Sequence, residues 1–178
     1  MKNGIALTLL GVFATTILCT SVRSKVVESL PDVFRSVLAE VKAKTRVPVL
    51  LPSELPRPFK DAKHPSVGVT TASEYEVSLY YELGAGDAGF AASFGATDNP
   101  RLPVRELGNV REVKLANGIA GFFRPVNCGG SCAPADLWWE QGAVLYQIQL
   151  KLRSTLTEKD QQRMIMTVAN SAILAGPR

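Results

Sequence analysis

The chain has 178 residues, of which 46% are hydrophobic and 20% charged, with a formal net charge of +4. This length suits a single domain with one buried core. Two of the basic residues, Lys2 and Arg23, lie in the first 24 residues. A further basic cluster between Arg101 and Arg124 alternates with acidic residues, so the charge favours a mixed solvated surface and no nucleic-acid partner.

Residues 1–24 have the pattern of an export signal: Lys2 precedes a long uncharged, apolar stretch that ends in small residues. Ser21 and Ser24 are the candidate last residues of a cleaved signal peptide. An uncleaved membrane tether through residues 5–22 stays open, because about 20 apolar residues suffice to span a bilayer. We therefore expect a periplasmic or extracellular protein, or one anchored in a bacterial inner membrane and facing the periplasm.

Residues 25–46 are predicted to contain an amphipathic helix, with Ser29 as a candidate N-cap. Its apolar residues recur every three or four positions, at Val33, Phe34, Val37, Leu38 and Val41. Residues 47–65 follow and contain five prolines, which exclude a central strand. We expect this segment either to cover the core or to act as a semi-rigid linker.

From residue 66 the apolar residues alternate with polar ones, which is typical of strands with one buried face. Three pairs of such segments are separated by turn residues and predict three antiparallel hairpins: 75–83 with 90–95, 113–116 with 119–123, and 136–139 with 144–152. Asn117-Gly118 is the strongest turn signal, because a type I′ turn needs positive φ at both positions.

The chain closes with a predicted helix from Glu158 to about Leu174, with Thr157 as its N-cap. Together the patterns predict an α+β fold: an antiparallel sheet of about six strands, packed with one amphipathic helix at each end of the domain. Residues 66–178 would form the core of this domain.

The cysteine pattern predicts one disulfide. Cys19 lies in the leader, which leaves Cys128 and Cys132 on either side of Gly-Gly-Ser in a chain expected to reach an oxidising compartment. The two glycines allow the tight turn that a disulfide across this spacing requires. A redox-active pair is the alternative, although thiol oxidoreductases usually carry Cys-x-x-Cys at the start of a helix.

No catalytic, metal or cofactor site is predicted. His64 is the only histidine, and a zinc site would need two ligands beyond the cysteine pair. Glu74 and Glu76 share a strand face, and exposure of this face to solvent explains them better than paired-carboxylate catalysis does. The glycines of residues 84–89 join two strands and so lack the helix of a phosphate-binding loop.

Adjacent aromatic residues point to opposite faces of a strand, so each pair places one ring away from the core. Tyr80, Phe122 and Trp138 are the candidates for an apolar platform on the outer sheet face. Such a platform would suit a hydrophobic ligand, a peptide or a protein. The alternative is that the second helix covers this face.

Two stretches resemble a domain of unknown function that occurs in bacterial exported lipoproteins and in extracytoplasmic parts of sporulation and anti-sigma-type membrane proteins. Residues 47–56, Val-Pro-Val-Leu-Leu-Pro-Ser-Glu-Leu-Pro, are similar to its proline-rich opening. Residues 137–171 are similar to its ending, a hairpin with tryptophan, glycine and tyrosine followed by a helix. The resemblance implies an antiparallel α+β fold with a sensing or binding role, and no catalytic residues.

The sequence thus leads to two hypotheses about function. The first is a noncatalytic binding or interaction module of the bacterial envelope, whose partner is an unknown protein or a hydrophobic ligand carried on the sheet face. The second is an envelope thiol-redox enzyme that uses Cys128 and Cys132.

Overall fold

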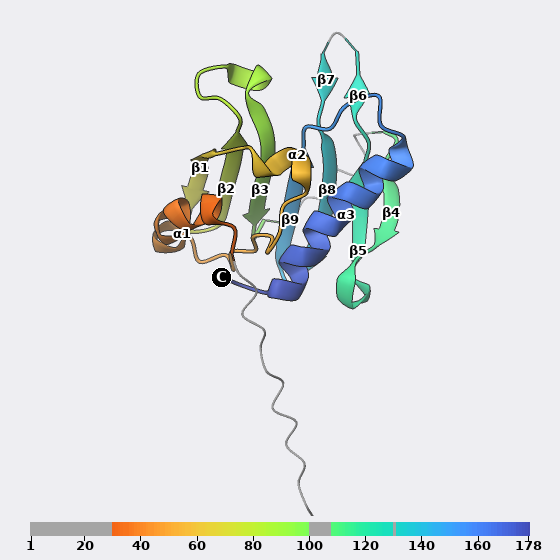
Figure 1. The fold of residues 1–178 in the computed structure, drawn as a ribbon. Coiled ribbons are helices and arrows are strands. Elements are labelled where there is room, and N and C mark those ends of the chain that lie inside the picture. Colours follow the sequence, from red (N-terminus) through yellow and green to blue (C-terminus); the bar gives the residue numbers. More distant parts are fainter. Residues whose placement is uncertain (1–29, 100–107, 130) are drawn as a thin grey trace, which may run out of the picture.

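The computed structural model describes residues 30–99, 108–129 and 131–178. They form one antiparallel sheet with helices on one of its faces, and a small ribbon that extends beyond the sheet (Figure 1). The helices are α1 (Asp32–Lys44), α2 (Arg57–Lys60) and α3 (Glu158–Ala175). The strands are β1 (His64–Thr71), β2 (Glu74–Tyr80), β3 (Phe90–Thr97), β4 (Arg111–Lys114), β5 (Ala120–Arg124), β6 (Asn127–Cys128), β7 (Cys132–Ala133), β8 (Ala135–Gln141) and β9 (Val144–Leu150).

The sheet has seven strands in the order β1-β2-β3-β9-β8-β5-β4, and β6 pairs with β7 in a separate two-stranded ribbon. The predicted α+β class and the pairing within all three predicted hairpins are confirmed: β2 with β3, β4 with β5, and β8 with β9. The prediction of about six strands omitted β1, an edge strand that pairs with β2 and has a register shift after Val67. This irregularity interrupts the alternation by which a strand is recognised in sequence.

Asn117 and Gly118 both have positive φ, 57° and 77° respectively, as the Asn-Gly signal predicts. They are the central residues of a turn that the amide of Ile119 closes by donating to the carbonyl of Ala116 at 3.3 Å. A second hydrogen bond, from the amide of Leu115 to the carbonyl of Ile119, joins this turn to the ends of β4 and β5.

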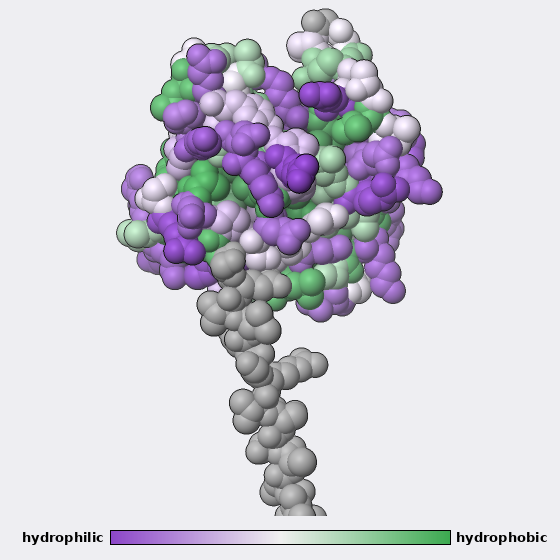
Figure 2. Space-filling model, in the orientation of Figure 1, coloured by the Kyte–Doolittle hydropathy of each residue, from purple (hydrophilic) through white to green (hydrophobic). Residues whose placement is uncertain are grey.

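Helix α1 packs on β1, and α3 packs on β8 and β9. Helix α1 begins at Asp32, and its N-cap residue is Pro31, which forms no side-chain cap. Ser29, the predicted N-cap, lies outside the described residues. Helix α3 begins as predicted, because the Thr157 hydroxyl accepts a hydrogen bond from the amide of Asp160 at 3.2 Å. Figure 2 shows the helix-bearing side, where mostly hydrophilic residues lie over α2 and along α3.

The core lies between the helices and the inner sheet face, where Phe34 of α1 meets Phe94 of β3 edge to face at 5.2 Å. Trp139 of β8 stacks on Tyr146 of β9 at 5.4 Å. Each of these rings exchanges contact with water for contact with another ring. Aromatic pairs of this kind contribute strongly to the stability of a core.

The proline-rich segment contributes to this core, because its apolar residues are buried: Val47, Val49, Leu50, Leu51, Leu55 and Phe59. Tyrosines of the sheet fasten its backbone. The Tyr75 hydroxyl accepts from the amide of Leu50 at 2.9 Å and donates to the carbonyl of the same residue. Tyr146 donates to the carbonyl of Pro48 at 3.1 Å.

The predicted signal segment, residues 1–24, lies outside the described residues, and so does the tether through residues 5–22. Among the helices that the structure describes, none is long and apolar enough to cross a membrane.

Candidate functional site

The outer face of the sheet, which lies opposite the helices, carries rows of residues from strands that are distant in sequence. One row runs Glu76, Gly95, Gln147, Trp138 and Phe122, each the register partner of the next. The neighbouring row lies two residues along each strand and consists of Ser78, Ser93, Gln149, Asp136 and Arg124. Alternation along each strand places these side chains on one face.

Asp136 is the organising residue of this face, with 0% of its surface exposed. Its Oδ2 accepts hydrogen bonds from the Nε of Arg124 at 2.9 Å and from the terminal NH₂ of the same guanidinium. Arg124 itself is 17% exposed in its side chain and lies over the Trp138 ring, 5.5 Å from its centroid. A buried carboxylate is tolerated only when it is paired and hydrogen-bonded in this way.

The other oxygen of Asp136 sets the orientation of two glutamine side chains. Its Oδ1 accepts from the Nε2 of Gln147 at 3.1 Å and from the Nε2 of Gln149 at 2.6 Å. A carboxylate can only accept, so both amides must present their NH₂ groups to it and turn their carbonyl oxygens away. The Oε1 of Gln149 then accepts from the Ser93 hydroxyl at 3.2 Å.

Beside these glutamines the outer face is hollowed into a cleft of about 520 Å³. Its lining residues come from β1, β2, β3, β8 and β9: Val69, Glu74, Tyr75, Glu76, Ser93, Gly95, Ala96, Thr97, Trp138, Leu145, Gln147 and Gln149. Gly95 lies between Glu76 and Gln147 in the row. Because glycine has no side chain, nothing at this position fills the space between the two polar residues. This volume falls within the range of small-molecule sites.

The two glutamates of the cleft are half-buried. Glu76 accepts a hydrogen bond from the Ser78 hydroxyl at 3.2 Å. Within the described part of the chain, neither Glu74 nor Glu76 forms an ion pair, and the cleft lining contains no lysine or arginine. The cleft therefore presents uncompensated carboxylates together with oriented amides.

Of the three aromatic residues predicted for this face, only Trp138 lines the cleft. It is 3% exposed and does not belong to the core cluster, so it is buried on the outer side of the sheet. Phe122 is its neighbour on β5 and is half-buried. Tyr80 lies near the other edge against Phe90, 6.0 Å between ring centroids. These rings do not form an exposed apolar platform, because Gln147 and Gly95 lie between Trp138 and Glu76 of β2.

The sequence pattern does place Glu76, Gln147 and Gln149 on polar strand faces, but it offers no sign that they meet. They meet because β3 pairs with β9, which lies more than 50 residues further along the chain. Asp136 was not predicted as a site residue for a similar reason. It is a single aspartate among apolar residues, and its hydrogen-bond partners become its neighbours only when the sheet is assembled.

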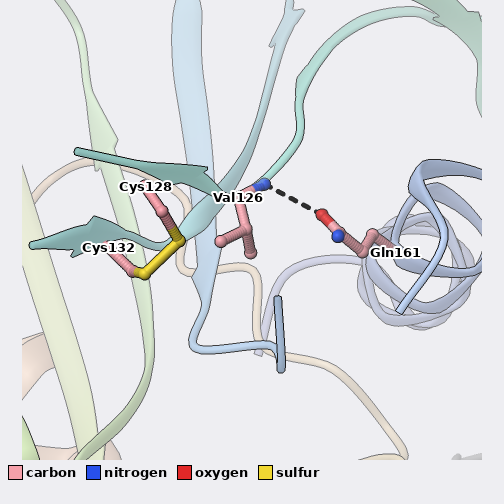
Figure 3. Close-up of a disulfide and its surroundings, with 4 residues drawn as sticks. All are labelled: Val126, Cys128, Cys132 and Gln161. Carbon is pink, nitrogen blue, oxygen red and sulfur yellow. Dashed lines mark hydrogen bonds between the residues drawn. A yellow bond between two sulfur atoms is a disulfide. The ribbon is translucent and has the colours of Figure 1, made fainter. Parts of the chain in front are cut away.

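The predicted disulfide between Cys128 and Cys132 is confirmed. The two residues are direct partners across the β6–β7 ribbon, and both are exposed. Figure 3 shows the bond close to Val126, whose amide donates to the Oε1 of Gln161 at 2.9 Å. Gln161 of α3 is buried, so this hydrogen bond fastens the base of the ribbon to the helix layer.

The remaining residues considered from sequence are not brought together. His64 is the first residue of β1, and the segment Gly86–Ala88 forms a short 3-10 turn between β2 and β3. In residues 30–99, 108–129 and 131–178, no group of three or more His, Cys, Asp or Glu side chains is arranged to hold a metal ion.

Comparison with known proteins gives no match. No family model matches the chain, no curated protein matches its sequence, and no solved structure matches its fold. We therefore infer the function from the chemistry of the outer-face cleft.

Proposed function

We propose that this chain is a noncatalytic binding module of the bacterial envelope, and that it holds a small polar ligand in the outer-face cleft. The observation that carries the proposal is the orientation of Gln147 and Gln149 by the buried carboxylate of Asp136. Fixed polar groups in a concave site lower the entropic cost of binding and define the orientation of a ligand.

The lining contains apolar residues as well as polar ones, but its polar groups do not favour the hydrophobic cargo considered from sequence. Two carboxylates and two amides would lose hydration under an apolar ligand without gaining hydrogen bonds, which is costly. The sensing or binding role implied by the resemblance agrees with a binding module, and the export signal predicted for residues 1–24 supports the envelope location.

The thiol-redox alternative has one supporting observation, the exposure of Cys128 and Cys132. However, both residues lie in a strand ribbon and neither begins a helix, which is where oxidoreductases lower the pKa of the attacking thiol. A redox titration separates the two roles, because a redox-active pair exchanges reversibly with glutathione at potentials near those of disulfide oxidoreductases.

The proposed function is tested by titrating the isotope-labelled protein with a panel of small polar metabolites and following its amide resonances. We expect at least one compound to shift the side-chain amides of Gln147 and Gln149. Gln147→Leu should weaken that response by about tenfold, because it removes a hydrogen-bonding group from the cleft. Gln141→Leu is the control, since Gln141 is exposed at the β8–β9 turn and does not line the cleft. A panel that shifts no cleft resonance contradicts the proposal.

A further inference from the structure

A second cleft, of about 800 Å³, lies on the helix-bearing side of the molecule. Its lining comes from segments that are distant in sequence: α2 with its C-terminal end, the ends of β2 and β3 with the loop between them, the turn after β9, and α3. None of its lining residues belongs to the outer-face cleft, so the two clefts are separate sites. Its volume is within the range of small-molecule sites.

Much of the lining of this second cleft is apolar. Phe90, Leu152, Leu156 and Met164 all line it. Tyr81 adds the surface of its ring, because its hydroxyl donates to the carbonyl of Pro58 at 2.6 Å and is therefore already paired. The Tyr81 side chain is one of the large hydrophobic groups that remain exposed, at 39%. A ligand with a hydrocarbon part would gain free energy by covering these side chains.

Two basic residues of the lining lie directly next to this apolar surface, one on each side of Leu152 in the sequence. The ammonium of Lys151 donates to the backbone carbonyls of Asp87 and Ala88, which leaves one of its three N–H groups for a ligand. Arg153 is exposed, and its guanidinium forms no ion pair or hydrogen bond with any residue that the structure describes. All of its donors are thus open to a ligand.

Asp61 is the only acidic residue among those that line this cleft, and it lies near Tyr81. Burial is the largest cause of the raised pKa of Tyr81, and the charge of the Asp61 carboxylate adds to the rise. With two basic residues against this one carboxylate, the lining carries a net positive charge. The group that complements it is an anion, which forms charge-assisted hydrogen bonds with a guanidinium or an ammonium.

We infer that the second cleft binds a single-chain amphipathic carboxylate, with its hydrocarbon chain on the apolar lining and its carboxylate at Arg153 and Lys151. Leu152 lies between the two basic residues, so the places for the chain and for the head group adjoin. This inference goes beyond the polar ligand proposed for the outer-face cleft. It concerns a different site and is tested independently.

The test uses decanoate as the probe, at pH 7, low salt and concentrations that do not form micelles. Titration of the isotope-labelled full chain should shift the resonances of Phe90, Leu156 and Met164. Decylammonium has the same chain with the opposite charge and should bind at least about fivefold more weakly, because it places a cation beside Arg153. Octanoate should also bind more weakly, since each buried methylene strengthens binding by up to about fourfold. Added salt should reduce the preference for decanoate over decylammonium.

Variants of opposite sign locate the head group. Arg153→Gln removes the positive charge and should weaken decanoate binding by about fivefold, whereas Asp61→Asn removes the negative charge and should strengthen it by about twofold. Arg46→Gln is the matched control, because Arg46 is exposed beyond the end of α1 and does not line the cleft. All three positions are exposed, and unchanged melting temperatures establish that the variants fold.

Several results would overturn the inference. Equal affinities for decanoate and decylammonium would show that the basic residues do not select the head group. Equal affinities for decanoate and octanoate would show that the apolar lining does not hold the chain. A decanoate affinity that is the same in Arg153→Gln as in wild type, or decanoate shifts confined to residues outside this cleft, would place the ligand elsewhere.

Discussion

Asp136 shows how one residue can be both a stability problem and the basis of a site. Its carboxylate is fully buried, and four hydrogen bonds from Arg124, Gln147 and Gln149 compensate for the lost hydration. Removal of the carboxylate would leave a partly buried guanidinium and two amides without their partner. The loss of stability would then come from the guanidinium and the two amides, which would lack a hydrogen-bond partner.

Asp136→Ala is therefore expected to lower the free energy of unfolding by about 3–5 kcal/mol, the range for breaking one side of a buried ion pair. Urea denaturation measures this change. Glu40→Ala is the control, because Glu40 pairs with Lys44 on the exposed side of α1, at 2.6 Å, and should cost less than about 0.5 kcal/mol. Similar effects for the two variants would show that Asp136 is not the centre of a cooperative network.

At the scale of elements, the proline-rich segment is held to the sheet by tyrosine hydroxyls. Burial raises the pKa of Tyr146 from 10.0 to about 12, and burial is also the largest cause of the raised pKa of Tyr75. Both hydroxyls contact backbone groups of the segment, at Pro48 and Leu50. The proline-rich segment should therefore loosen when these hydroxyls lose their protons.

The sign of the pH dependence follows from the raised pKa. The unfolded chain releases the Tyr146 proton near pH 10 and the folded chain only near pH 12, so stability is intact below pH 10 and decreases above it. Tyr146→Phe should cost about 1 kcal/mol at pH 7 through the lost hydrogen bond, and this difference from wild type should shrink by pH 11.

Urea denaturation at pH 7, 10 and 11 checks this expectation. Tyr80→Phe serves as the control, because Tyr80 is half-buried at the end of β2 and its ring contacts Phe90 rather than the proline-rich segment. A difference between wild type and Tyr146→Phe that stays constant with pH would contradict the assigned role of the hydroxyl.

At the scale of the whole molecule, the disulfide and the predicted signal segment both lead us to expect a protein outside the cytoplasm. The bond between Cys128 and Cys132 closes a short loop outside the core, so it should contribute only about 2 kcal/mol through chain entropy. It persists only in an oxidising compartment. The disulfide is thus consistent with the export that the pattern of residues 1–24 predicts.

Expression in a bacterial host, followed by fractionation and intact-mass measurement before and after reduction and alkylation, tests both parts. We expect the protein outside the cytoplasm, with a mass corresponding to cleavage after Ser21 or Ser24 and two alkylated cysteines only after reduction. A protein that stays in the cytoplasm with free thiols contradicts the envelope location. A full-length protein in the membrane fraction identifies the uncleaved tether.

The sequence by itself determined the local elements, because alternation, turn residues and helical periodicity depend on neighbours along the chain. It therefore predicted the three hairpins, helix α3 with its Thr157 cap and the disulfide. It did not reveal β1, whose register shift breaks the alternation, and it left open whether the proline-rich segment covers the core or acts as a linker.

Only the tertiary structure decided the site. The pairing of β3 with β9 places Glu76 and Gly95 in one row with Gln147 and Trp138, and the pairing of β8 with β9 brings Asp136 to the glutamines. These neighbours are chosen when the inner faces of all strands are buried together against the helices, a condition that no local stretch of sequence contains. The polar outer face and its cleft result from that choice.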